Sequence, residues 1–191
     1  MSEIVVDQEI SIRPARAEDA PALFALIDAD RAYLSRWLPW PPDIKSAEDE
    51  RAHIEKTSTP EAASKRLGGL IVYQGQLAGS AVIQGVDSTD RSAEIGFWLA
   101  ERFQHRSIMA RSCRALLDIA LGEKGLNRVQ LRAVTGNVRS RAVAERLGFT
   151  CEGVQRQATL VQGRYQDLAV YSLLASEWAV LQRRSAPAKD G

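Results

Sequence analysis

The chain has 191 residues, of which 45% are hydrophobic and 26% are charged, and its formal net charge is +1. This length suits one packed domain, and the near-neutral charge gives no reason to expect direct binding to nucleic acid or to an anionic membrane. The apolar runs are strand-sized, far short of the roughly 20 residues that cross a bilayer, and the N-terminal stretch lacks a secretory signal pattern. We therefore expect a cytoplasmic protein.

The first half of the chain predicts a strand, two helices and a hairpin. Residues 10–15 alternate apolar and polar side chains and run into a proline, which favours a short strand. Apolar residues recur at helical spacing over residues 17–38, and a Ser-x-x-Asp start resembling a capping box opens a second helix over residues 46–56. Strands over residues 67–73 and 77–85 flank a Gln-Gly-Gln turn.

The second half predicts strands and helices in alternation. We expect a strand over residues 92–100, a helix over 108–121, a strand over 128–134, a short helix over 140–149 and a hairpin over 153–174 that turns at a Gln-Gly pair. Residues of the longer helix that share its apolar face are Ile108, Cys113, Leu116, Leu117 and Ala120.

This mixture of helices and strands predicts one α/β (α+β) domain over residues 10–178. We expect a mixed, mostly antiparallel central sheet of about seven strands, with helices on both faces. Residues 1–9 are then an N-terminal extension, and residues 179–191, which are polar and rich in small side chains, form a frayed C-terminal tail.

A polar loop, Gln104-His105-Arg106-Ser107, joins the strand over 92–100 to the helix over 108–121. The first N–H groups of a helix have no partner within it, and the helix dipole adds partial positive charge at that end, so the junction is suited to a phosphate. Nearby arginines are either anion ligands or a solvated helix face, and both interpretations are open: Arg102, Arg106, Arg111 and Arg114.

The order of these elements and several short stretches resemble the GNAT family of N-acetyltransferases, and within it the branch that acetylates N-terminal alanine or serine of ribosomal proteins. The resemblance covers about residues 10–178. It is carried by "RWLPW" (36–40), "RSAEIGFWL" (91–99), "FQHRSIM" (103–109), "GLNRVQLRAVTGNVRSRAVAERLGF" (125–149), and "EGV" with "GRYQDLAVYSLL" (152–174).

The resemblance implies that acetyl-coenzyme A (acetyl-CoA) is the acetyl donor and that its diphosphate lies on the backbone N–H groups of the loop. The residues implied are Gln104, His105, Arg106, Ser107, Ile108 and Met109. The family usually has glycine at position 107, and this branch often has it at position 105. Glycine permits close backbone approach and unusual φ values, so side chains at both positions narrow the site. Undiminished and impaired coenzyme A binding are both open.

The resemblance also implies a bulge in the preceding strand that exposes backbone groups to the pantetheine arm and thioester. The residues nearest to it are Phe97, Trp98 and Leu99, for which core packing is the alternative. Asn137 follows the strand over 128–134, and its amide either bonds the amides of pantetheine or caps the next helix. These two roles are compatible.

Two residues are candidates for proton transfer. Ser140 matches the serine that is the candidate acid in the branch that this chain resembles, whereas many relatives have a tyrosine at the position of Ala144. A capping role is the alternative for Ser140. Glu94 is a candidate base acting through a water, or a solvent-facing strand residue. Some members of the branch place a glutamate where this chain has Thr159, which cannot act as a base at neutral pH.

The resemblance further implies that the acceptor site involves Trp37 and Trp40, with Tyr165 as another wall; an aromatic pair at this spacing also suits a core. The predicted function is transfer of an acetyl group to a primary amine, with a protein N-terminus as the best guess and small amines as other candidates. The alternative is a catalytically impaired module that binds a ligand or a protein. We predict a monomer or homodimer, and no metal site, because no histidine or cysteine spacing indicates one.

Overall fold

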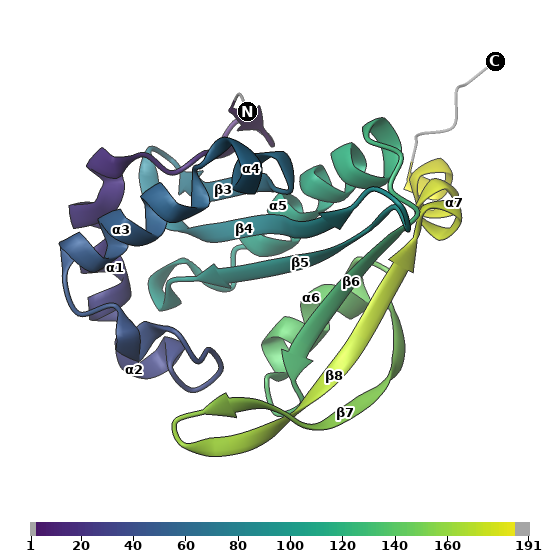
Figure 1. The fold of residues 1–191 in the computed structure, drawn as a ribbon. Helices are drawn as coiled ribbons and strands as arrows, with labels where there is room; N and C mark the ends of the chain where they lie inside the picture. Colours follow the sequence, from purple (N-terminus) through teal and green to yellow (C-terminus); the bar gives the residue numbers. More distant parts are fainter. Residues whose placement is uncertain (1–2, 186–191) are drawn as a thin grey trace.

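A computed structural model describes residues 3–185 of the chain (Figure 1). Eight strands form one sheet in the order β1-β2-β3-β4-β5-β6-β8-β7, and all neighbouring strands are antiparallel except β5 and β6. The strands are β1 (Ile4–Val5), β2 (Ile10–Arg13), β3 (Leu67–Tyr73), β4 (Gln76–Asp87), β5 (Ser92–Leu99), β6 (Arg128–Val134), β7 (Thr150–Val161) and β8 (Arg164–Leu174).

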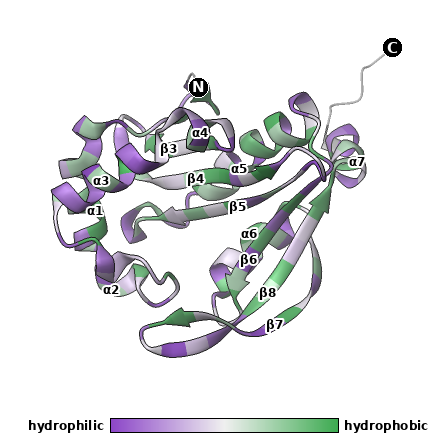
Figure 2. Ribbon diagram, viewed as in Figure 1, coloured by the Kyte–Doolittle hydropathy of each residue, from purple (hydrophilic) through white to green (hydrophobic). Residues whose placement is uncertain are grey.

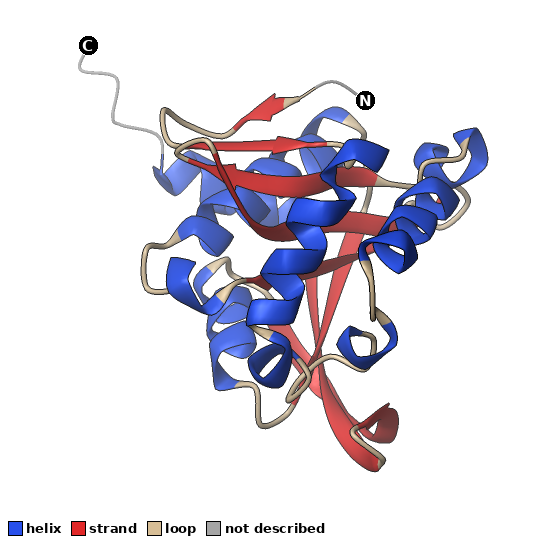
Figure 3. Cartoon of the chain, turned by 90° about the vertical axis from the view of Figure 1, so that its left-hand side faces the viewer, coloured by secondary structure: helices blue, strands red, loops and turns tan. Residues whose placement is uncertain are grey.

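The helices are α1 (Ala20–Ala29), α2 (Arg31–Leu34), α3 (Ala47–Thr57), α4 (Pro60–Ser64), α5 (Ile108–Leu117), α6 (Val138–Arg146) and α7 (Ala175–Ser185). They cover both faces of the sheet: α1, α3 and α4 lie on one side of the central strands, and α5 and α6 lie on the other (Figures 1 and 3). The predicted fold class is confirmed. The sheet has eight strands, one more than predicted, because β1 pairs with β2.

The predicted helix over residues 17–38 is wrong in two respects, since it is interrupted at Asp30, between α1 and α2, and it ends at Leu34. The backbone N–H of Glu101 donates to Asp30 Oδ2 at 2.6 Å, so a residue distant in sequence holds the break. The predicted boundary at residue 178 falls inside α7, and β1 lies within the predicted extension. The last part of the predicted tail, residues 186–191, lies outside the described residues.

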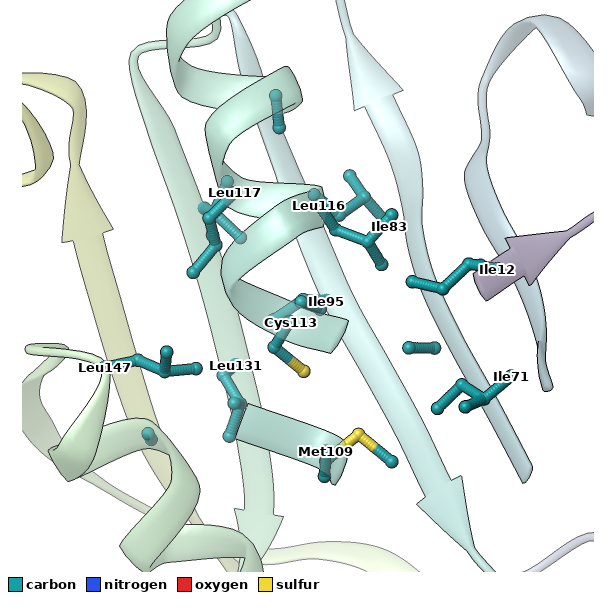
Figure 4. Packing of buried hydrophobic residues seen from close by; sticks show 14 of the residues in the cluster. Ile12, Ile71, Ile83, Ile95, Met109, Cys113, Leu116, Leu117, Leu131 and Leu147 are labelled. Atoms are coloured by element: carbon teal, nitrogen blue, oxygen red, sulfur yellow. The ribbon is translucent and has the colours of Figure 1, made fainter. Parts of the chain in front are cut away.

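The core lies between the sheet and α5. The apolar face predicted for this helix is confirmed, since Ile108, Cys113, Leu116 and Leu117 have no exposed surface and pack toward the isoleucines of β2 to β5 (Figure 4). Burial raises the pKa of the Cys113 thiol, so this cysteine stays protonated and unreactive. Figure 2 shows the opposite character on the outer helix α3, which is mostly hydrophilic. None of the described helices is long and apolar enough to cross a bilayer.

The sheet opens in its middle. β5 pairs with β6 only over residues 92–94, opposite residues 128–130. Beyond Glu94, β5 remains bonded to β4 alone and β6 to β8 alone, and the two strands diverge (Figure 1). One edge of each strand is therefore left without a β partner, and the ends of both strands face a gap. This gap positions the functional site.

The buried carboxyl of Glu50 on α3 gives a prediction about stability. Its side chain is 4% exposed, and no ion pair or hydrogen bond reaches its carboxyl from the described residues. Burial therefore raises the pKa of Glu50 to about 7, from the ordinary glutamate value of 4.5. Because the folded protein binds this proton more tightly than the unfolded chain does, the contribution to stability is full below pH 4.5 and is lost as pH rises through about 7.

We expect Glu50→Gln to remove that pH dependence and to raise the free energy of unfolding at pH 8 by about 1.5 kcal/mol. Denaturant unfolding at pH 5 and at pH 8 measures this. Glu55→Gln, at an exposed position of the same helix, is the matched control and should leave the free energy of unfolding unchanged at both pH values. An unchanged pH dependence in Glu50→Gln would contradict the assignment.

Candidate active site

A cavity of about 410 Å³ lies where β5 and β6 diverge. Its walls come from α2 and the segment after it, the end of β5, the loop before α5, the first turn of α5, and α6 along its length. Most predicted site residues line it: Trp37, Phe97, Trp98, Leu99, Gln104, His105, Arg106, Ser107, Ile108, Met109, Asn137 and Ser140. The fold thus brings together residues that are as far apart in the chain as Trp37 and Ser140.

The loop adopts the backbone conformation that glycine usually supplies. His105 has φ 62° and Ser107 has φ 56°, so both lie in the left-handed region. This region costs a residue with a side chain roughly 1–2 kcal/mol. Ser107 is also the N-cap of α5, although its side chain makes no capping hydrogen bond. The two non-glycine positions are therefore strained, and they keep the turn that the phosphate loop needs.

The N–H groups of this loop are free. In the described part of the chain, no backbone or side-chain acceptor bonds any N–H from His105 to Ala110. Consecutive free N–H groups around left-handed residues form a concave anion site, and the dipole of α5 adds to it. Because these residues line the cavity, the junction presents its donors where a diphosphate would lie.

The bulge expected near Phe97, Trp98 and Leu99 is absent. From Glu94 to Leu99 the pairing of β5 with β4 runs without a shift, and the register shift between these strands lies at Gln84–Asp87 of β4. The free edge of β5 results instead from its divergence from β6. The three side chains line the cavity and also pack against the core, so core packing is observed for them and a role at the thioester stays a prediction.

Asn137 and Ser140 lie together at the start of α6. Asn137 Oδ1 accepts from the backbone N–H of Ser140 at 3.1 Å, which confirms Asn137 as a helix N-cap. Its amide nitrogen has no partner among the described residues. The Ser140 hydroxyl is half-buried and likewise unbonded within the described structure. Ala144, where many relatives have a tyrosine, is fully buried and does not line the cavity.

Trp37 closes the gap between the two halves of the sheet. It follows α2, on the β5 side, and packs against Val134, Val161 and Leu168 of β6, β7 and β8. It also lies 3.5 Å from the position of a Cβ on Gly136. Trp40 does not line the cavity; it packs on Trp98, with ring centroids 5.9 Å apart.

Two other predicted site residues lie away from the cavity. Glu94 faces a separate surface hollow and pairs with Arg132, Oε2 to Nη2, at 2.8 Å. Tyr165 is 68% exposed on the β7–β8 hairpin, and Thr159 lies half-buried in the same hairpin. Among the described residues, no group of three or more His, Cys, Asp or Glu side chains is placed to hold a metal.

A model of the "Acetyltransferase (GNAT) domain" family matches residues 9–150. The chain belongs to the GNAT family. It is 38% identical to the Bacillus subtilis (strain 168) "Putative ribosomal N-acetyltransferase YdaF", over 91% of this chain and 95% of that protein. It is 25% identical to the Escherichia coli (strain K12) "Ribosomal-protein-serine acetyltransferase", over 88% and 94%. It is therefore an N-acetyltransferase that uses acetyl-CoA.

Solved structures of other acetyltransferases have the same fold as this enzyme. A structure of RimL, a ribosomal L7/L12 alpha-N-protein acetyltransferase in complex with coenzyme A, superposes with a TM-score of 0.87 and 30% identity, covering 92% of this chain and 99% of that one. The impaired module that the missing glycines suggested is not favoured. Both positions hold the left-handed conformation without glycine, and the N–H groups stay free.

Sequence analysis missed Tyr33 and Arg139, which line the cavity and are both bonded to Gln104. Gln104 Nε2 donates to the hydroxyl of Tyr33 at 2.5 Å, and Gln104 Oε1 accepts from Arg139. The glutamine thus links α2 to α6 across the loop. Tyr33 lies four positions before the candidate Trp37, and Arg139 is next to the candidate Ser140. Their closeness to these two candidates in the sequence was the signal that could have identified them.

The four arginines near the loop have three different surroundings. Arg106 lines the cavity, and its guanidinium lies 5.9 Å from the ring centre of Tyr73. Arg102 stacks on Phe103 and Arg114 stacks on Trp178, so both sit on aromatic rings rather than in the cavity. Arg111 contacts carboxylates of the N-terminal segment.

The residues of this cavity fit the diphosphate and arm of acetyl-CoA. The free N–H groups of residues 105–110 supply donors for a diphosphate, and the apolar end of β5 beside Asn137 suits an arm that carries two amides. Arg139 and Arg146 add positive charge on the α6 wall. These observations agree with the use of acetyl-CoA as the acetyl donor.

Proposed function

We propose that this enzyme acetylates the N-terminal amine of a protein, in the manner that the names of its relatives state for theirs. The similarity to RimL covers 92% of this chain and 99% of that one, so it extends well beyond the part that faces coenzyme A. Similarity limited to the coenzyme half would not point to an acceptor. A cytoplasmic location and a monomeric or homodimeric state stay predictions.

The observation that carries the proposal is the lack of a carboxylate on the cavity wall. Among the described residues that line it, the titratable side chains are Tyr33, His105, Arg106, Arg139 and Arg146. A protein α-amine has a pKa of about 8, whereas a lysine amine has one of about 10.4. Near neutral pH a useful fraction of the α-amine is already neutral, so it needs only a water path to lose its proton. A lysine amine would need a base, and no carboxylate lines the cavity; His105, the one imidazole among the described lining residues, lies in the loop that faces the diphosphate.

In the proposed mechanism each site residue has a role. Acetyl-CoA supplies an activated acetyl thioester. The N–H groups of residues 105–110 bind and orient its diphosphate, and Asn137 bonds the arm. The free edge of β5 near Trp98 and Leu99 orients the acetyl group. Ser140 donates a proton to the leaving sulfur. Trp37 walls the acceptor site.

The remaining candidates have lesser roles in this proposal. Trp40 supports Trp98 from behind rather than touching the acceptor. Glu94 is held by Arg132 outside the cavity, so a direct role as base is not part of the proposal. Tyr165 lies on an exposed hairpin and would contact only a part of the acceptor beyond its first residues.

The test compares two peptides of matched composition under saturating acetyl-CoA. One has a free N-terminal serine and no lysine, and the other has a blocked N-terminus and one lysine. We expect mass spectrometry to show acetylation of the first at a rate at least about a hundredfold above the second, with a rate that rises with pH up to about 8. Equal acetylation of the two peptides, or acetylation of small amines alone, would contradict a protein N-terminus as acceptor.

A further inference from the structure

The backbone carbonyl of Arg106, between the left-handed residues His105 and Ser107, accepts a single hydrogen bond from the described residues. Arg106 stands between His105 and Ser107, and its carbonyl oxygen accepts from Arg111 Nη2 at 3.3 Å. No other hydrogen bond reaches this oxygen from the described residues. Arg111 lies one turn into α5, and its own N–H donates to the Ser107 carbonyl at 3.0 Å. One arginine therefore contacts the loop through both its backbone and its side chain.

The other side of this guanidinium is held by two carboxylates. Arg111 Nη1 donates to Asp7 Oδ2 at 2.8 Å and to Glu9 Oε2 at 2.9 Å. Arg111 Nε is buried without a partner among the described residues. Nη1 and Nη2 of Arg111 are thus both hydrogen-bonded, whereas Nε is not bonded within the described structure. The side chain is therefore oriented by the partners of its two terminal nitrogens.

Both carboxylates are themselves fixed. Asp7 Oδ1 accepts the backbone N–H groups of Glu9 and Ile10 at 2.8 and 2.9 Å, which makes a local turn before β2. Glu9 Oε1 accepts from the Tyr73 hydroxyl at 3.2 Å and from Gln74 Nε2 at 2.9 Å. The guanidinium is therefore anchored where β2 begins and β3 ends, and it reaches the loop as a rigid arm.

We propose that Arg111 is a positioning residue for coenzyme A, holding the 106–107 peptide so that His105 and Ser107 stay left-handed without glycine. In a trans peptide the N–H points opposite to the carbonyl. A guanidinium that fixes the Arg106 carbonyl therefore also fixes the N–H of Ser107, one of the free donors of the loop. Without this contact, the loop relaxes toward ordinary φ values and the peptide turns.

This inference gives residues 7–9 a function. Asp7 and Glu9 belong to a segment that precedes β2, and through their contacts with Arg111 they help to fix the conformation of the loop before α5. The proposal rests on the coenzyme site of the proposed function and does not depend on the acceptor, because it concerns coenzyme binding alone. Its test therefore uses coenzyme A without acceptor, so that a wrong acceptor leaves the result unaffected.

The test is a double-mutant cycle read by titration calorimetry with coenzyme A. Arg111→Lys keeps one charge for Asp7 and Glu9 but loses the second arm that reaches the Arg106 carbonyl. We expect it to raise the Kd about tenfold. In a His105→Gly, Ser107→Gly background the same change should raise the Kd by less than about twofold, because glycine occupies the left-handed region freely.

Arg114→Lys, one turn further along α5 and stacked on Trp178, is the matched control and should leave the Kd unchanged. An equal loss in the parent and in the glycine background would mean that Arg111 acts in some other way, and no loss in the parent would also overturn the proposal. If Arg111→Lys does not fold, Asp7→Asn with Glu9→Gln releases the same arm and leaves α5 intact. The loss of coenzyme A affinity in this variant should likewise be much smaller in the His105→Gly, Ser107→Gly background.

Discussion

Replacing Ser107 with valine is expected to raise the Kd for coenzyme A about thirtyfold, whereas Ser107→Gly should keep or lower it. Ser107 has φ 56°, a region that β-branched residues almost never occupy, at a cost of about 2 kcal/mol. Valine at this position forces the turn toward an ordinary conformation and removes the alignment of the free N–H groups. Titration calorimetry with coenzyme A measures both variants.

Glycine and valine at one position separate backbone conformation from side-chain chemistry. Neither carries a hydroxyl, so a shared loss would show that the Ser107 hydroxyl is a ligand of the phosphate. A loss in valine alone supports the backbone account. Thermal unfolding should show Ser107→Gly at least as stable as the parent, because relief of strain offsets the added freedom of the unfolded chain. Equal affinity of all three proteins would contradict the role given to this turn.

Removing the Ser140 hydroxyl is expected to lower turnover about a hundredfold, with a change of less than about twofold in the Kd for coenzyme A. The hydroxyl lines the cavity and has no partner among the described residues, so it is free to donate to the leaving sulfur. Ser140→Ala keeps the α6 cap, because Asn137 bonds the backbone N–H of residue 140 rather than its side chain. Steady-state kinetics with calorimetry separates the two effects.

Ser140→Thr is the matched control, since it retains a hydroxyl on the same helix turn, and it should recover most of the lost turnover. Unchanged turnover in Ser140→Ala would remove this residue from the mechanism. Affinity that falls as far as turnover would instead make Ser140 a ligand of the coenzyme.

Much of the fold follows from local pattern in the sequence. The apolar face of α5 and the Gln-Gly turns of two hairpins depend on residues within a few positions of one another, and sequence analysis predicted them. The break at Asp30 depends on Glu101, and the extra strand β1 depends on pairing with β2. Such tertiary contacts leave no local pattern, which is why one long helix and about seven strands were predicted.

The candidate site shows the same division. The resemblance to the GNAT family implied most of the cavity wall, from Trp37 to Ser140, but it also implied a strand bulge that the register of β5 excludes. The interpretation of Glu94 as a base placed this residue near the chemistry, and it lies outside the cavity. Glu94 points to Arg132, a choice of strand face and partner that spacing alone does not fix. The sequence left coenzyme A binding without glycine open, because the contact that we propose to support the turn depends on Arg111 and on Asp7 and Glu9, which lie far away in the chain.

Nuclear magnetic resonance of the 15N-labelled protein tests the central claim most directly, because it observes the N–H groups of residues 105–110 one by one. Coenzyme A and pantetheine are compared as ligands, since pantetheine has the arm without the diphosphate. The account predicts that coenzyme A moves these amide resonances downfield and slows their exchange with solvent, and that pantetheine does neither. Saturation with coenzyme A that leaves residues 105–110 unperturbed would contradict it.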